Sequence, residues 1–281
     1  MFKKYLIIAS KKDLAGIGIT TALSQFRENP LISSMNEKPG FDFYLVDNEI
    51  IYTENLNLEK INQYDFVIFA SKHSSSKSGK KQKTLSVHSP GNFKEALLGG
   101  ESEKICISSA LFQKKLFENL NKISKNYNMQ EKYQVTLECT HHGPLINKPC
   151  VFIEIGPTET EWKDRKAAFV IAKTISSTIE DFKENPYHEI VIGIGGPHYC
   201  PNFNKIQFKS NYAISHIISG YNLPLTEQMI LEAIQKTREE VDLVILDWKG
   251  IANSQERERI IKILDKNYLR YKKTKEIKKD L

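Results

Sequence analysis

The sequence lacks the features that define several common classes of protein. Its four cysteines (106, 139, 150 and 200) are far apart and form no C-x-x-C pair, which argues against a disulfide framework and against a zinc ribbon. No apolar run is long enough to span a bilayer, and the segment 1–10 becomes polar too soon for a signal peptide. We therefore expect a soluble protein of a reducing cytoplasm with no membrane partner. We also expect a monomer that has no DNA partner.

Familiar catalytic motifs are absent as well. The stretch 16–18 (G-I-G) lacks a third glycine, and 78–81 (S-G-K-K) lacks the upstream glycine and the hydroxyl residue of a phosphate-binding loop. Neither H-E-x-x-H nor G-x-S-x-G occurs, which excludes helix-borne zinc proteases and the usual serine hydrolases. Chemistry on nucleoside triphosphates is also not expected.

The sequence does contain an alternation of short apolar runs and helical repeats. Apolar runs bounded by turn residues predict strands, and apolar spacings of three and four predict helices. The predicted strands cover 5–9, 41–46, 66–70, 104–107, 133–139, 150–155, 189–194 and 241–246, and the predicted helices cover 112–127, 162–182 and 229–234. This alternation favours a three-layer α/β/α fold with a mixed, largely parallel sheet, in which functional loops gather at the carboxyl ends of strands.

The 281 residues are enough for one sizeable core. We expect a single catalytic domain at 1–267, with a possible division near 99–100, and a basic segment at 268–281. The segment 71–92 is the longest without predicted regular structure. Because it carries two histidines, a functional loop is favoured over disorder.

Two stretches carry most of the predicted chemistry. The segments 138–144 (E-C-T-H-H-G-P) and 193–201 (G-I-G-G-P-H-Y-C-P) each place histidine on a tight turn after an apolar strand. Such a turn fixes an imidazole while leaving it accessible. The turn at 143–144 allows His141 and His142 to share one site, and Glu138 can orient an imidazole. The alternatives are structural roles for the histidines and a salt-bridged strand end for Glu154.

Basic residues crowd two parts of a chain whose formal charge is +6. Such clusters suit a phosphate-rich partner, although a solvated surface of a heat-adapted protein explains them equally well at the C-terminus. The candidates for contact with nucleic acid are Lys72, Lys77, Lys80, Lys81 and Lys83.

Several motifs occur in a fixed order along nearly the whole chain. They are S-x-x-D-x-A-G at 10–16, His73 with S-G at 78–79, L-x-V-H-x-P-G-N at 85–92, T-H-H-G-P at 140–144, E-I-G at 154–156 with T-E-x-x-W at 158–162, G-G-x-H-Y-x-P at 195–201 and D-W-K-G at 247–250. Together they resemble the archaeal and plant D-aminoacyl-tRNA deacylases. The sequence departs from that family at Pro157, at Cys200 and at 202–204 (N-F-N).

The resemblance implies a fold similar to phosphorylases and peptidyl-tRNA hydrolase, and hydrolysis of the ester that joins a D-amino acid to tRNA. It also implies zinc as the cofactor. We expect catalytic roles for His141, His142, Glu138, Glu154, Glu159 and His198, and zinc ligation by His73, His88, His141, His142 and His198. The lysines at 72–83 would contact phosphates of the tRNA acceptor stem.

Two other functions remain open from the sequence. An enzyme of the same architecture, such as a zinc exopeptidase or a nucleoside phosphorylase, would share the fold with another substrate. A non-enzymatic RNA-binding module would use the histidines to hold structural zinc.

Overall fold

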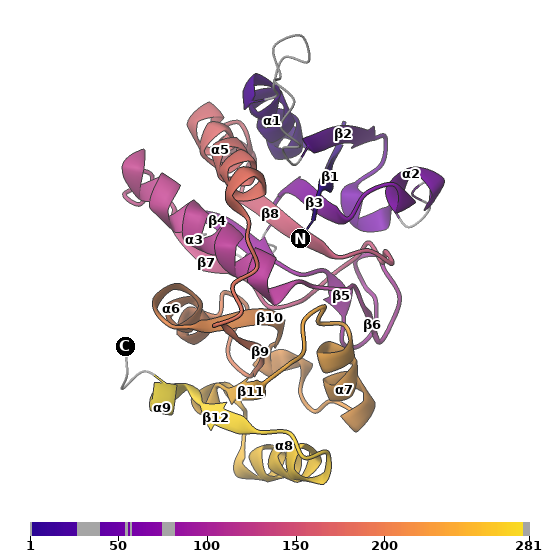
Figure 1. Cartoon of the computed structure of the whole chain (residues 1–281), viewed down its shortest axis with the longest axis vertical. Helices are drawn as coiled ribbons and strands as arrows, with labels where there is room; N and C mark the ends of the chain where they lie inside the picture. The colour runs from indigo at the N-terminus through magenta and orange to yellow at the C-terminus, as the bar shows by residue number, and fades with distance from the viewer. Residues whose placement is uncertain (1, 27–39, 54–55, 57, 75–81, 278–281) are drawn as a thin grey trace.

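The strands form two main sheets, one in each half of the molecule (Figure 1). The computed structural model describes residues 2–26, 40–53, 56, 58–74 and 82–277. The first sheet has the order β2-β1-β3-β8-β4-β7, with β1 (Lys4–Ser10), β2 (Gly40–Val46), β3 (Phe66–Lys72), β4 (Thr84–His88), β7 (Gln134–Leu137) and β8 (Cys150–Gly156). Its neighbouring strands are parallel except for the antiparallel pair β4 and β8.

The second sheet is parallel throughout and has the order β10-β9-β11-β12. Its strands are β9 (Glu189–Ile194), β10 (Tyr212–Ile218), β11 (Leu243–Leu246) and β12 (Tyr271–Lys273). A short antiparallel pair is formed by β5 (Gly91–Asn92) and β6 (Lys104–Ile105).

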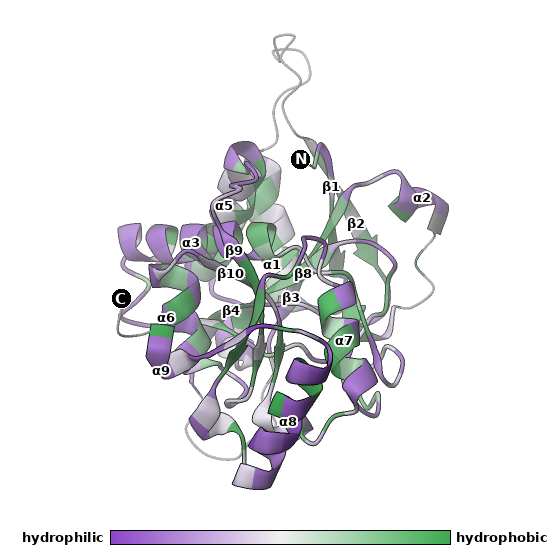
Figure 2. Ribbon diagram, turned by 60° about the horizontal axis from the view of Figure 1, so that its bottom comes forward, coloured by the Kyte–Doolittle hydropathy of each residue, from purple (hydrophilic) through white to green (hydrophobic). Residues whose placement is uncertain are grey.

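Helices cover both sheets. Helices α1 (Leu14–Leu23), α3 (Ala110–Asn126) and α5 (Arg165–Asp181) pack on one face of the first sheet, and α2 (Leu58–Asn62) lies toward the other. In the second sheet, α6 (Pro201–Lys209) and α9 (Thr274–Ile277) lie on one face, and α7 (Glu227–Gln235) and α8 (Ser254–Lys266) on the other. The short helix α4 (Glu159–Trp162) precedes α5. Figure 2 shows hydrophobic strands inside and hydrophilic residues along α3 and α8.

The alternation of side chains along β8 decides where the polar residues go. Val151, Ile153 and Ile155 enter the core shared with α1, α3 and α5, because successive residues of a strand point to opposite faces. Phe152 belongs to the hydrophobic cluster on the opposite face. Glu154, two residues further along, therefore lies on the same side as Phe152.

The predicted α/β fold with its mixed, mostly parallel sheet is confirmed, and each predicted strand has a counterpart in the structure. The prediction that 71–92 has no regular structure is wrong for Thr84–His88, which form the buried strand β4, and at the two ends of the segment, which belong to β3 and β5. Thr84, Ser86 and His88 share one face of β4. Because these residues are polar and the surrounding segment is rich in Ser and Lys, the sequence shows no apolar run that would predict the strand. The strand β10 was missed for a similar reason, because Ser215 and His216 interrupt its apolar run although both are buried.

The described part of the basic C-terminal segment contributes to the second sheet. Residues Tyr271–Lys273 pair with β11, and Ile277 of α9 is buried in the core. Thr226 caps the start of α7, since its side chain accepts a hydrogen bond from the backbone N–H of Met229 at 3.2 Å. Among the described residues, every helix is too short or too polar to cross a membrane.

Candidate active site

Five of the seven histidines gather around two buried glutamates. The ring centroids of His88 and His141 lie 4.3 Å apart, those of His141 and His198 4.6 Å, and those of His73 and His198 5.8 Å. The remaining members are His142, Glu138 and Glu154. Seven of the eight residues predicted for the site therefore converge, although they are spread from residue 73 to residue 198.

The topology explains this convergence. His73 directly follows β3, His88 ends β4, and Glu138 directly follows β7. His141 and His142 lie in the loop after β7, and this loop reaches the second sheet through the backbone bond from Thr140 N–H to the carbonyl of Ile217. His198 comes from the loop after β9, and its carbonyl accepts a hydrogen bond from Cys139 N–H at 2.9 Å. Loops of both sheets thus build one site.

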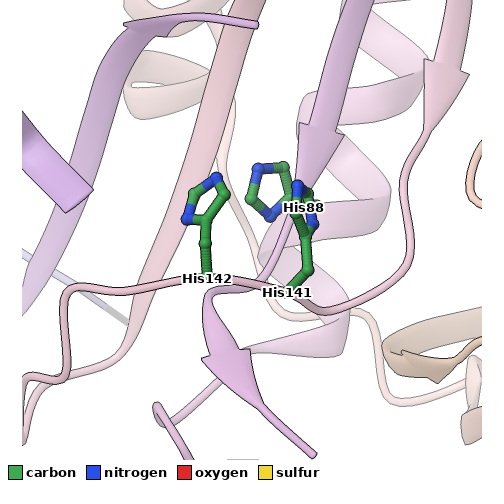
Figure 3. A group of neighbouring side chains, drawn as sticks. All are labelled: His88, His141 and His142. Atoms are coloured by element: carbon green, nitrogen blue, oxygen red, sulfur yellow. The ribbon is translucent and has the colours of Figure 1, made fainter. Parts of the chain in front are cut away.

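His88, His141 and His142 form a trio of neighbouring rings (Figure 3). The Nδ1 atom of each ring bonds a backbone carbonyl: Ser89 at 3.2 Å from His88, Cys139 at 2.8 Å from His141 and Gly143 at 2.6 Å from His142. Because a carbonyl oxygen only accepts, each Nδ1 carries the hydrogen and each Nε2 keeps its lone pair. An imidazole fixed in this way is prepared to bind a metal through Nε2.

The free lone pairs face carboxylate oxygens. His88 Nε2 lies 3.7 Å from Glu154 Oε2, and both atoms are buried without a hydrogen-bond partner. His141 Nε2 lies 3.6 Å from Glu138 Oε2. Two buried acceptors at such distances repel each other unless a cation lies between them. The ligand atoms of the trio lie within 4.8 Å of one another, so the arrangement suits a metal ion.

The pKa values of His141 and His142 agree with neutral rings. Burial lowers the pKa of His142 to about 4, and the neighbouring imidazole of His88 lowers it further. Burial and the neighbouring imidazoles hold the pKa of His141 well below its ordinary value. Both rings therefore keep a lone pair at neutral pH.

Glu138 sits between two other histidines. Its Oε1 lies 3.2 Å from His73 Nδ1, and its Oε2 bonds His198 Nε2 at 3.1 Å. Burial works to raise the pKa of Glu138, but the two imidazoles outweigh it and hold that pKa well below its ordinary value. Burial opposes charge on His73 too, yet Glu138 and Glu154 raise the pKa of His73 to about 10. This half of the site is therefore an ionic group of buried carboxylates and imidazolium rings.

The charge on His198 has a second support. Against the effect of burial, contacts with Cys139 and Glu138 raise the pKa of His198 to about 10. Its Nδ1 lies 3.2 Å from the hydroxyl of Tyr221, which also lies 2.9 Å from Cys139 Sγ. With 26% of its side chain exposed, His198 lies at the solvent side of the cluster.

Two tyrosines at the site were missed from the sequence. The hydroxyl of Tyr199 lies 3.0 Å from His73 Nε2, and Tyr221 contacts His198 and Cys139. Tyr199 stands next to His198 in the G-G-x-H-Y motif, so its position offered a signal. Tyr221 lies in no motif, and only the packing of the loop after β10 brings it here.

Glu159 is the predicted site residue that the structure leaves outside the cluster. It is exposed on α4 and pairs with Lys163. Its neighbour Glu161 is buried and pairs with Lys83 at 2.9 Å.

The described lysines of the predicted tRNA contact are engaged within the protein. Lys72 pairs with Glu49 at 2.9 Å and lies 5.4 Å from the ring centroid of Trp162. Lys83 pairs with Glu161. The other three predicted lysines, Lys77, Lys80 and Lys81, lie outside the described residues.

Comparison with known proteins identifies relatives over most of the chain. A family model described as D-aminoacyl-tRNA deacylase matches residues 60–272. A protein of that name from Thermococcus onnurineus is 34% identical over 256 residues, which cover 87% of this chain and 91% of the relative. Another from Methanocaldococcus jannaschii is 32% identical over 277 residues, or 96% and 99% of the two chains.

The fold also matches a solved structure. The crystal structure of AF0625, a conserved protein of unknown function, superposes with a TM-score of 0.85 at 28% identity and covers 99% of this chain and 97% of that one. The segment matched by the family model contains all seven clustered residues.

Proposed function

The chain belongs to the D-aminoacyl-tRNA deacylase family, and on this premise we propose that it hydrolyses the ester between a D-amino acid and tRNA, releasing both. The observation that supports a hydrolytic site is the trio of imidazoles beside buried carboxylates. Family membership favours this reaction over the exopeptidase, the phosphorylase and the RNA-binding module considered from the sequence. The four buried thiols fit a reducing compartment such as the cytoplasm.

We propose zinc as the ion that the trio holds through the Nε2 atoms of His88, His141 and His142. Neutral imidazole suits zinc, and three protein ligands leave a coordination position for the substrate. A bound zinc ion supplies Lewis-acid polarisation of the ester carbonyl. Glu154, which faces both His88 and His73, then orients these rings.

Glu138 is the better placed of the two carboxylates to act as the general base. It contacts His141 and His198, whose side chains are 20% and 26% exposed, so it lies toward the side from which water enters. Glu154 instead contacts His88, whose side chain is fully buried. Because the low pKa of Glu138 keeps it ionised, its carboxylate is able to accept a proton from the attacking water.

His198 then serves as the proton donor to the leaving ribose oxygen. Its raised pKa keeps the ring protonated at neutral pH. Of the three imidazoles that contact Glu138, that of His198 is the most exposed. The hydrogen bond to Glu138 allows the proton taken from water to return to the ring. His73, held by Tyr199, fixes the carboxylate of Glu138 from the other side.

The reaction is tested with D-tyrosyl-tRNA and L-tyrosyl-tRNA, each with zinc-loaded and chelator-treated protein. We expect release of D-tyrosine but not of L-tyrosine, loss of release after chelation, and recovery on adding zinc. Absence of D-tyrosine release by zinc-loaded protein would refute the reaction. Full activity in protein shown to contain no metal would instead refute the zinc proposal alone.

The contact between Gly156 and His73 gives a second prediction. A Cβ added at Gly156 would lie 2.7 Å from Cβ of His73 and 2.9 Å from its carbonyl oxygen. The backbone of His73 is held in place, because Trp162 Nε1 donates a hydrogen bond to the same carbonyl at 2.9 Å. Gly156→Ala is therefore expected to displace His73 from Glu138 and to lower kcat about 100-fold.

The matched control is Gly40→Ala, because a Cβ there meets nothing within 4 Å. Steady-state kinetics and thermal unfolding of both variants separate misplacement from loss of the fold. A folded Gly156→Ala protein with the kcat of the Gly40→Ala protein would contradict the proposed position of His73.

A further inference from the structure

We propose that the surface at the carboxyl end of the second sheet binds the single-stranded 3′ end of the RNA substrate. This 3′-end surface comprises Tyr221, Trp248, Lys249, Arg257 and Lys273. The inference rests on the proposed function, because the ester to be cleaved then lies on the terminal adenosine. It adds a binding surface outside the lysines of the 72–83 segment.

The parallel arrangement of the second sheet brings these residues to one edge. His198 follows β9, Tyr221 follows β10, and Trp248 and Lys249 follow β11, while Lys273 is the last residue of β12. Helix α8, which starts just after the β11 loop, carries Arg257 (Figure 1). Loops at the carboxyl ends of parallel strands are the usual place for ligands.

The 3′-end surface is continuous with the active site. Gly196 N–H donates to the carbonyl of Gly250 at 3.3 Å, and Gly220 N–H donates to the carbonyl of Gly196 at 2.7 Å. A Cβ at Gly220 would lie only 2.3 Å from the carbonyl oxygen of Gly250, so no side chain separates these loops. An RNA end whose ester lies at His198 therefore meets the loops that carry Tyr221 and Trp248.

Tyr221 gives this surface an aromatic ring on which a base can stack. Tyr221 is 58% exposed, yet its hydroxyl is fixed by His198 and Cys139, so the ring is both oriented and accessible. Its plane lies within 24° of the His198 ring. A fixed, exposed aromatic ring is a platform on which a base stacks, and we assign the terminal adenine to Tyr221.

Trp248 orders the cations of the surface. Lys273 Nζ lies 4.1 Å and the Arg257 guanidinium carbon 5.2 Å from the centroid of its ring. These cation–π contacts hold the charges beside the exposed Lys249. A group of cations around an aromatic ring matches alternating phosphates and bases.

Within the described ranges, no acidic side chain forms an ion pair with Lys249, Arg257 or Lys273. Glu256 pairs with Arg259. Glu276 accepts a hydrogen bond from the backbone N–H of Lys273. Lys249 and Lys273 are thus more available to phosphates than Lys72 and Lys83, which are paired, whereas Arg257 bonds the carbonyl of Ile251 at 2.9 Å.

The test compares two double variants that each remove two positive charges. Lys249→Gln/Lys273→Gln changes the proposed surface, and Lys122→Gln/Lys125→Gln changes two exposed lysines of α3. We expect only the first to lower kcat/KM for D-tyrosyl-tRNA, by about tenfold. For uncharged tRNA, it should also reduce the slope of log Kd against the logarithm of the salt concentration by about 1.4. Both should cleave D-tyrosyl-adenosine, which has no phosphates, as the unchanged protein does.

Three results would decide against the inference. They are equal losses in both double variants, unchanged tRNA binding by Lys249→Gln/Lys273→Gln, and an equal loss by that variant on D-tyrosyl-adenosine. Failure of the unchanged protein to hydrolyse D-tyrosyl-tRNA would instead refute the proposed function, while the tRNA-binding comparison would still test the surface.

The stacking role of Tyr221 is tested with Tyr221→Leu and Tyr221→Phe. Tyr221→Leu removes the ring and should raise KM severalfold for both D-tyrosyl-tRNA and D-tyrosyl-adenosine, because adenine is present in each. Tyr221→Phe keeps the ring and should reverse most of the rise in KM that Tyr221→Leu causes. An equal rise of KM in both variants would assign the effect to the hydroxyl and overturn stacking.

Discussion

His141→Ala is expected to abolish the release of D-tyrosine from D-tyrosyl-tRNA. His141 is the centre of the cluster, with ring centroids of His88 and His142 each 4.3 Å away and that of His198 4.6 Å away. Its removal takes one nitrogen from the proposed zinc site, so metal analysis should show a protein with less than the normal zinc content. Single-turnover release of D-tyrosine gives the loss of activity.

His188→Ala is the matched control for this variant. His188 immediately precedes the first residue of β9, whereas His198 follows the other end of that strand. His188 bonds the carbonyl of Asn211 near the surface and has no place in the cluster. Zinc content and turnover should therefore stay unchanged in His188→Ala. Undiminished turnover in folded His141→Ala would remove His141 from the mechanism.

Much of the site could be predicted because its residues follow strands. The turns at 141–144 and 195–198 combine histidine with glycine and proline, which marks a rigid loop, and parallel strands bring such loops to one edge. The register of β4 could not be predicted, because His88 is brought to Glu154 by an antiparallel pairing of strands distant in sequence. The position of Tyr221 was equally hidden, since it depends on contact between two loops.

The two glutamates of α4 show why a motif alone does not place a side chain. Glu159 and Glu161 both lie within the T-E-x-x-W motif at 158–162. They differ only in the direction of their side chains on a helix of four residues. Glu161 turns inward to Lys83 and Thr158, while Glu159 faces solvent. Sequence spacing specifies neighbours within an element, but burial depends on what packs against it.

The chemistry of the site depends on separating two kinds of histidine. The rings of the trio bond carbonyl groups through Nδ1, which leaves each Nε2 available for a metal ion. His73 and His198 bond carboxylates instead and gain a proton, which suits proton transfer. Glu138 is the residue that connects the two kinds, because it contacts His141 as well as His73 and His198.

Glu138→Gln is therefore expected to lower kcat by roughly 10²–10⁴-fold, the usual contribution of a general base. The amide keeps the size of the side chain, so zinc content and thermal stability should change less than in His141→Ala. Loss of the carboxylate charge also removes one cause of the raised pKa of His198. The alkaline limb of the residual kcat profile should consequently move to lower pH, because His198 loses its proton sooner.

Glu159→Gln provides the control with the same chemical change. Glu159 is exposed and pairs only with Lys163 among the described residues, so its replacement should leave kcat and the pH profile unaltered. If Glu138→Gln instead held zinc and retained kcat within a fewfold of the control value, that result would assign the general base to Glu154. Glu154→Gln should then show the larger loss of kcat. Equal losses in Glu138→Gln and Glu159→Gln would contradict the assignment of the base to the buried cluster.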